Sequence, residues 1–124
     1  MPERLRLSRA RGFRLPLKAK SVARPHRWGN PFIVWRNQEW YADTWNTAEH
    51  HMGFAVKCAD NLTARWIATE AYSQALDGGW KMLPSKDEIR KVLAGLDLAC
   101  WCPLPEPGQP DWCHATVLLK EANQ

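Results

Sequence analysis

The sequence predicts a small α/β fold: a single domain with a small sheet, a hairpin and about three covering helices. Three observations support this fold class. The chain has 124 residues, which is enough for one hydrophobic core and too few for two. Hydrophobic residues make up 45% of the chain and charged residues 24%, an ordinary globular composition. Two segments with helix-start signals lie between apolar segments that are typical of strands.

The first twenty residues are predicted to form a basic, partly irregular N-terminal arm, followed by a single α/β domain at residues 21–124. Residues 1–36 hold ten Lys or Arg and one acidic residue, about +9, whereas the remainder carries about −5. A cationic segment on a mildly acidic body suggests a polyanionic partner, such as nucleic acid or a phosphorylated ligand. The alternative is that the basic segment folds back onto the acidic body of the same chain.

A rigid turn is predicted at residues 24–32, which read RPHRWGNPF. Its two prolines fix φ and restrict the residues before them, while Gly29 permits a positive φ. We expect this turn to present side chains that bind a ligand; the candidates are Arg24, Arg27, Trp28 and Asn30.

Short apolar segments predict the strands of the sheet. Residues 21–24 are a candidate short strand that ends before a proline, and residues 33–41 form a hairpin around a polar turn. Residues 96–102 are predicted to be a buried strand. We expect this strand and the hairpin to belong to the same small sheet. Residues 44–58 are ambiguous between a loop and a loop with one helical turn.

The first predicted helix has a clear start and a clear end. Asp60 or Asn61 can cap it, and it runs to about Leu76, before two glycines. Its apolar positions approximate one helical face: Leu62, Trp66, Ile67, Ala71 and Leu76.

Two further helices follow. Ser85 and Glu88 have the spacing of a capping box and predict a helix whose inward residues are Ile89, Val92 and Leu93. After a loop with four prolines, Cys113 or His114 begins the last helix. Its inward residues are predicted to be Val117 and Leu118.

Three cysteines and a histidine form the strongest chemical signal in the sequence. Cys100 and Cys102 are two residues apart on a predicted strand, so both thiols face the same side. The proline-rich loop then returns Cys113 and His114 toward the end of that strand. A thiol at this position lies at the start of a helix, where the free N–H groups and the helix dipole favour a thiolate.

Three interpretations of this cluster compete. The first is a structural zinc site of the Cys₃His type, in which Cys58 could replace Cys113 or His114. The second is a catalytic thiol, most plausibly Cys113, with its pKa lowered by the helix terminus and with assistance from His114 or His51. The third is that small apolar cysteines simply fill the core.

Other candidate groups give weaker signals. The pair His50–His51 lies in a segment predicted as a loop, where paired histidines are more often solvated than functional. Glu70, in the first helix, is one of several acids that could serve as a base. No segment is apolar over the length of a membrane span, and no secretory signal is present. We therefore expect a cytoplasmic protein with reduced thiols, in which cysteines indicate metal binding or catalysis before disulfides.

Three motifs taken together resemble a known family. They are RGFRLP at residues 11–16, RPHRWGNPF at residues 24–32, and LDLACWCPL at residues 96–104 followed by CHA at residues 113–115. This combination resembles the domain of unknown function DUF4326, a small family carried by bacteriophages and bacteria, and it extends over residues 11–123. Family members typically have a shorter loop between the second and third cysteines. The resemblance implies a phage setting, with the host cytoplasm as location, and no particular reaction.

We therefore expect a phage-type accessory protein that binds a nucleotide or nucleic acid, with zinc held by Cys100, Cys102, Cys113 and His114. Arginines suit a phosphate and a tryptophan offers a stacking plane for a base. One alternative is an enzyme acting on nucleotides or nucleic-acid bases, such as a base–sugar bond hydrolase or transferase, in which Glu70, Asp97 or Cys113 would take part in catalysis. Another is a host-takeover protein that binds a bacterial protein through exposed tryptophans.

Overall fold

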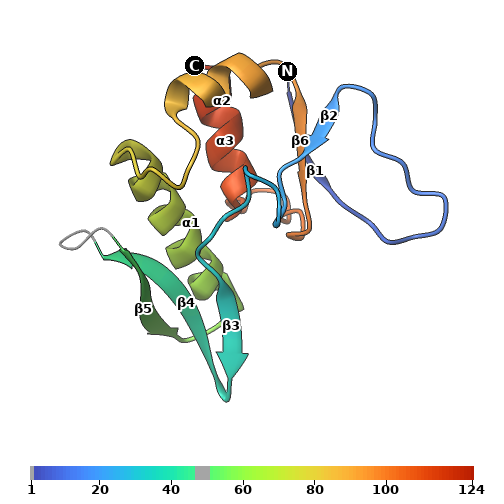
Figure 1. The fold of residues 1–124 in the computed structure, drawn as a ribbon. Coiled ribbons are helices and arrows are strands. Elements are labelled where there is room, and N and C mark those ends of the chain that lie inside the picture. Colours follow the sequence, from blue (N-terminus) through green and yellow to red (C-terminus); the bar gives the residue numbers. More distant parts are fainter. Residues whose placement is uncertain (1, 47–50) are drawn as a thin grey trace.

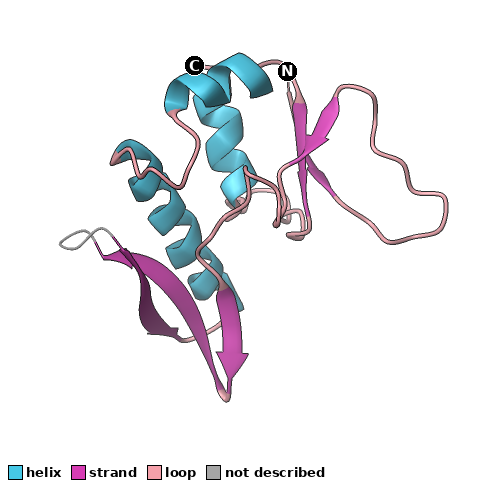
Figure 2. Cartoon of the chain, in the orientation of Figure 1, coloured by secondary structure: helices cyan, strands magenta, loops and turns pink. Residues whose placement is uncertain are grey.

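The structure, a computed structural model, describes residues 2–46 and 51–124, and the side chains of residues 2–44 and 55–124. This part of the chain contains three helices and two three-stranded sheets (Figures 1 and 2). The predicted fold class, a small single α/β domain, is confirmed. In chain order the elements are β1 (Arg4–Arg6), β2 (Ala19–Ser21), β3 (Val34–Asn37), β4 (Glu39–Asn46), β5 (His51–Cys58), α1 (Asn61–Asp77), α2 (Lys86–Leu93), β6 (Asp97–Cys100) and α3 (His114–Ala122).

The first sheet joins the two ends of the chain. Its central strand β6 pairs in parallel with β1 on one side and with β2 on the other. The segment predicted as an irregular arm therefore contributes two strands, and the short strand predicted at residues 21–24 lies at Ala19–Ser21 instead. Strands of three residues are too short to show a period in the sequence. They form because β6, an almost fully buried strand, requires a hydrogen-bonding partner on each edge.

The second sheet is antiparallel, in the order β3–β4–β5. The predicted hairpin is confirmed, with Trp35 opposite Tyr41 and their rings stacked at 4.3 Å between centroids. The ambiguous segment of residues 44–58 supplies the end of β4 and the whole of β5, with a register shift between Thr44 and Asn46. The hairpin does not share a sheet with β6, so the expectation of one sheet is wrong and there are two.

Helix α1 confirms the first predicted helix. Asp60 is its N-cap, and its side chain accepts a hydrogen bond of 2.8 Å from the backbone N–H of Thr63. The helix packs on β4 and also contacts α3, and its buried residues are mostly small: Ala64, Ala68, Thr69, Ala71, Tyr72, Ala75 and Leu76. Leu62 and Trp66, two apolar positions of the predicted helical face, are about half exposed. Alanines allow the helix to approach the sheet closely, so the larger apolar residues lie at the rim.

Helices α2 and α3 complete the core. The Oγ of Ser85 accepts a hydrogen bond of 3.1 Å from the backbone N–H of Glu88, which confirms the predicted start of α2. In α3, Leu118 is fully buried as predicted, whereas Val92 of α2 is largely exposed. Helix α3 packs on β6 and contacts both α1 and α2, so it joins the two sheets into one core. None of the helices that the structure describes is long and apolar enough to cross a membrane.

Candidate metal centre and its pocket

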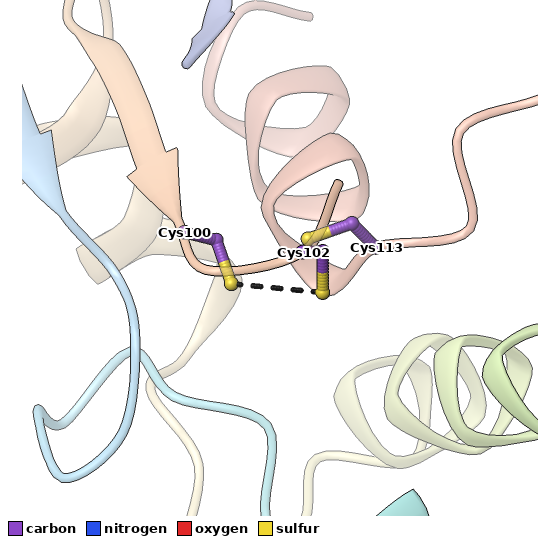
Figure 3. A group of neighbouring side chains, drawn as sticks. All are labelled: Cys100, Cys102 and Cys113. Atoms are coloured by element: carbon purple, nitrogen blue, oxygen red, sulfur yellow. Dashed lines mark hydrogen bonds between the residues drawn. The ribbon is translucent and has the colours of Figure 1, made fainter. Parts of the chain in front are cut away.

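Three thiols meet where β6 ends and α3 begins. Cys100 is the last residue of β6, Cys102 lies in the loop that follows it, and Cys113 is the N-cap of α3. Figure 3 shows the sulfur atoms of Cys100 and Cys102 directed toward one another, and their separation is 3.9 Å. All three Sγ atoms lie within 4.8 Å of one another. The predicted convergence of the strand end and the last helix therefore brings these cysteines together.

The spacing of the sulfur atoms suits a metal ion. With zinc–sulfur bonds of about 2.3 Å in a tetrahedral shell, two sulfur ligands lie about 3.8 Å apart. The distance of 3.9 Å between the sulfurs of Cys100 and Cys102 is close to this value. Three thiols without a disulfide, two of them buried and one half-buried, are donors that a soft divalent ion prefers. This group can therefore hold a metal ion.

His114 lies against the thiols with one ring nitrogen directed toward them. Its Nε2 is 2.7 Å from the carbonyl oxygen of Val22, and its Nδ1 is 4.0 Å from Sγ of Cys100 and 3.9 Å from Sγ of Cys113. Because a carbonyl only accepts hydrogen bonds, Nε2 carries the proton and donates it. The lone pair is therefore on Nδ1, the nitrogen that faces the sulfurs. A partner on the far ring nitrogen is the usual way in which a protein fixes the orientation of a metal-binding histidine.

The three thiols of the cluster differ in pKa. Hydrogen bonds from Cys102 and Cys113 lower the pKa of Cys100 well below its usual range. Hydrogen bonding to Cys100, together with burial, raises the pKa of both Cys102 and Cys113. The ionisation of each thiol therefore depends on the other two, and a thiolate is favoured within the cluster.

Arg4 closes the long loop that connects Cys102 to Cys113. Its guanidinium forms two bonds of 2.9 and 3.0 Å to the carboxylate of Asp111, and it donates to the carbonyls of Cys102 and Pro103 at 2.8 Å. Only 6% of this side chain is exposed. One residue of β1 thus holds both ends of the loop, beside the thiols. The sequence offered no signal for this role, because Arg4 is one of ten cations in a segment without a period.

A pocket of about 400 Å³ opens beside the thiols. The cysteines and His114 form one part of its wall, and the remainder is cationic, aromatic and apolar. Its charged and aromatic lining residues are Arg9, Arg24, Arg65, Phe32, Trp101 and Trp112, and Asn30 adds an amide.

The four ligand-binding residues predicted in the turn lie in different places. Arg24 and Asn30 line the pocket, where Nη1 of Arg24 donates to the carbonyl of Asn30 at 2.7 Å. The side chain of Asn30 is occupied within the fold, since its amide donates to a carbonyl of α1 and accepts from a backbone N–H. Arg27 lies on the surface in an ion pair of 2.6 Å with Glu88, and Trp28 is buried in the core. Neither of these two lines the pocket.

The remaining candidates also lie away from the pocket wall. Glu70 is exposed on α1, and Asp97, at the opposite end of β6 from the thiols, accepts a hydrogen bond from the backbone of Glu3. Cys58 is buried in β5, outside the thiol group, and burial raises its pKa. His50 lies outside the described residues, as does the side chain of its neighbour in β5.

Two arginines and two tryptophans are among the lining residues of the pocket that sequence reasoning missed. The guanidinium of Arg9 lies 4.7 Å from the ring centroid of Trp101, and the ring of Trp112 contacts that of Trp66. Arg65 lies on α1, where its Nε atom is buried without a hydrogen-bond partner. Each of the two pocket tryptophans is adjacent to a cysteine of the cluster, which is a signal that the sequence did contain. Arg9 and Arg65 had none, because only the fold brings them to the same wall.

The fold and this site define a small α/β domain with a three-cysteine candidate metal centre beside a cationic, aromatic pocket. The chain belongs to the family described as domain of unknown function (DUF4326), whose model matches residues 5–124. This confirms the resemblance that the motifs indicated and extends it to almost the whole chain. No curated protein and no solved structure matches the chain significantly.

Proposed function

We propose that this domain binds a nucleotide in the pocket, beside a structural zinc ion held by Cys100, Cys102, Cys113 and His114. The observation that carries the proposal is the composition of one pocket wall. Three arginines and two exposed or half-exposed indole rings converge next to the thiols and the imidazole.

The zinc part of the proposal rests on the fit of the fourth donor. In a tetrahedral Cys₃His shell, a histidine nitrogen lies about 3.6 Å from each sulfur. The observed distances from Nδ1 of His114 are 4.0 and 3.9 Å to the sulfurs of Cys100 and Cys113. His114 lies outside the group of three cysteines whose donor atoms are within 4.8 Å of one another, so its ring must move closer to Sγ of Cys102 to complete the shell. Three thiolates and an imidazole form a closed shell that selects zinc and stabilises a fold.

The nucleotide part rests on one unsatisfied polar atom, Nε of Arg65, a half-buried residue that lines the pocket. A guanidinium whose Nε is buried without a partner is costly unless an anion completes its hydrogen bonds. A phosphate is the anion that planar guanidinium groups bind best, and Arg24 and Arg9 line the same pocket. The rings of Trp101 and Trp112 offer flat apolar surfaces on which a base can stack. A pocket of about 400 Å³ is within the range of small-molecule sites.

The zinc centre is tested by elemental analysis of protein purified without a metal-binding tag. We expect one zinc per chain in the wild type and in Cys58→Ser, the matched control that removes a buried thiol outside the cluster. We expect zinc loss and unfolding in Cys102→Ser. A metal-free wild type, or equal zinc in Cys102→Ser and Cys58→Ser, would contradict the zinc centre.

Nucleotide binding is tested by calorimetric titration with nucleoside monophosphates, the corresponding nucleosides and inorganic phosphate. We expect the nucleotide to bind more tightly than the nucleoside or phosphate alone. Arg65→Gln should weaken binding about 10- to 100-fold, the value of one charge-assisted hydrogen bond. Lys81→Gln, which removes an exposed cation outside the pocket, should leave it unchanged. Absence of nucleotide binding, or equal affinity of the Arg65→Gln and Lys81→Gln variants, would refute the proposal.

A further inference from the structure

We propose that the nucleotide bound in the pocket is part of a single-stranded nucleic acid, whose backbone continues over the loop at residues 7–18. This loop, called the basic loop below, connects β1 to β2 and contains four cations: Arg9, Arg11, Arg14 and Lys18. The inference rests on the proposed nucleotide site and adds the class of ligand to it.

The cations of the basic loop have no acidic partners within the part of the chain that the structure describes. Elsewhere in the described residues, five of the thirteen cations are paired with a nearby acid. The paired cations are Arg4, Arg27, Lys57, Lys86 and Arg90. From the sequence, we considered that the basic segment folds back onto the acidic body of the chain. Arg4 and Arg27 do pair with acids of the body, but the cations of the basic loop do not. The charges of the basic loop are available to bind an anion of a partner.

The basic loop begins at the pocket. Arg9 lines the pocket and its guanidinium lies over the ring of Trp101, so the first cation of the loop belongs to the nucleotide site. From there the loop extends away from the helices, beside the parallel sheet (Figure 1). Phe13, near its tip, is 41% exposed and offers a further ring for a base. A cationic surface with an exposed ring thus continues outward from the pocket.

The arrangement favours a single-stranded nucleic acid over a mononucleotide and over a duplex. A mononucleotide can use the three arginines of the pocket, including Arg9, but it has no further phosphate to reach Arg11, Arg14 and Lys18. A duplex keeps its bases stacked inside, so none can enter a pocket lined by indole rings. A single strand offers both an accessible base and a run of phosphates, which is the combination that aromatic and cationic surfaces bind.

The test compares two variants that each lose three exposed cations. Arg11, Arg14 and Lys18 are changed to Gln in the loop variant; in the matched control variant the changes are Lys81→Gln, Lys91→Gln and Lys120→Gln. Binding of a fluorescent 12-nucleotide single strand is followed by anisotropy between 50 and 200 mM salt. Each phosphate contact contributes about 0.7 to the slope of log K against log salt, so the loop variant should lose about 2 from this slope. The control variant should keep the wild-type slope.

The same variants are titrated with a nucleoside monophosphate. We expect the loop variant to bind it as tightly as the wild type, because the loss lies outside the pocket. If Arg65→Gln weakens mononucleotide binding while the loop variant keeps the wild-type slope for the single strand, the basic-loop proposal is overturned and the pocket stands. Equal binding of the matched duplex also overturns it. If no mononucleotide binds, the proposed function fails, and this inference fails with it.

Discussion

Removal of the Arg4 guanidinium should loosen the candidate metal centre without touching any of its donors. In Arg4→Met the side chain keeps its apolar stem but loses two bonds to Asp111 and those to the carbonyls of Leu5, Cys102 and Pro103. Breaking a buried ion pair by removing one partner costs about 3–5 kcal/mol, because the other charge stays buried. Typical domains have only about 5–15 kcal/mol of stability in total.

The same substitution should weaken metal binding. Arg4 holds the carbonyl of Cys102 and the carboxylate of Asp111, two residues before Cys113, so it fixes the loop that carries two of the thiols. Loss of such an outer partner typically costs about 10- to 100-fold in metal affinity. We therefore expect zinc affinity to fall by this factor in any Arg4→Met protein that folds.

Zinc affinity is measured by competition with a chromogenic chelator, and stability by denaturant unfolding of the metal-loaded protein. Arg27→Met is the matched control, because Arg27 also pairs with an acid but is 58% exposed. An exposed pair contributes at most about 1 kcal/mol, so this variant should be nearly neutral. If Arg4→Met does not fold, Asp111→Asn is the milder change. The role assigned to Arg4 would be refuted if Arg4→Met or Asp111→Asn bound zinc as tightly as the wild type and was no less stable than Arg27→Met.

Three further predictions concern the surroundings of the site. A Cβ at Gly29 would lie 3.0 Å from main-chain atoms of Arg24, so Gly29→Ala should lower the free energy of unfolding by about 1–3 kcal/mol and weaken nucleotide binding. The N–H of Thr63 lowers the pKa of Asp60, so its stabilisation exists above the unfolded pKa and is lost as the pH falls through the folded pKa. Asp60→Ala should therefore lower the melting temperature at pH 7, with a difference that narrows in acid, measured by thermal melts. Burial raises the pKa of Cys58, so its alkylation at neutral pH should occur at the rate of unfolding; rapid alkylation of the folded protein would contradict this.

Local signals in the sequence predicted much of the fold. Caps such as Asp60 and Ser85 act within one helical turn, so the helix starts could be read directly from their spacing. The hairpin likewise depends on adjacent residues. The strands β1 and β2 could not be predicted, because they exist only through pairing with β6, far away in the sequence. The separation into two sheets depends on the same distant pairing.

The candidate site likewise contains some features that the sequence predicted and others that it did not. The three cysteines meet as predicted, but only the return of the loop acts as expected, because β6 ends at Cys100 and Cys102 lies in the loop after it rather than on the strand. The turn at residues 24–32 was more misleading, because Trp28, which we expected to bind a ligand, is buried in the core. A large ring flanked by polar residues fits a binding surface and a core equally well on sequence alone. Arg65 is the opposite case. Nothing in the sequence marks a single cation on a helix as functional, and its role follows only from the pocket that it lines.

The pairing of β1 with β6 also bears on how the protein forms during translation. Arg4 stands opposite Leu98, so the first strand is made long before its partner. At about 5–20 residues per second, β1 waits on the order of 5–20 s for β6 to be synthesised. Asp111, which pairs with Arg4, and Cys113 are synthesised later still, so a nascent chain cannot bind the proposed zinc ion until its last helix begins to emerge. Incomplete chains that end before that point would lack the Arg4–Asp111 pair and the centre together, which should make them ready substrates for proteases.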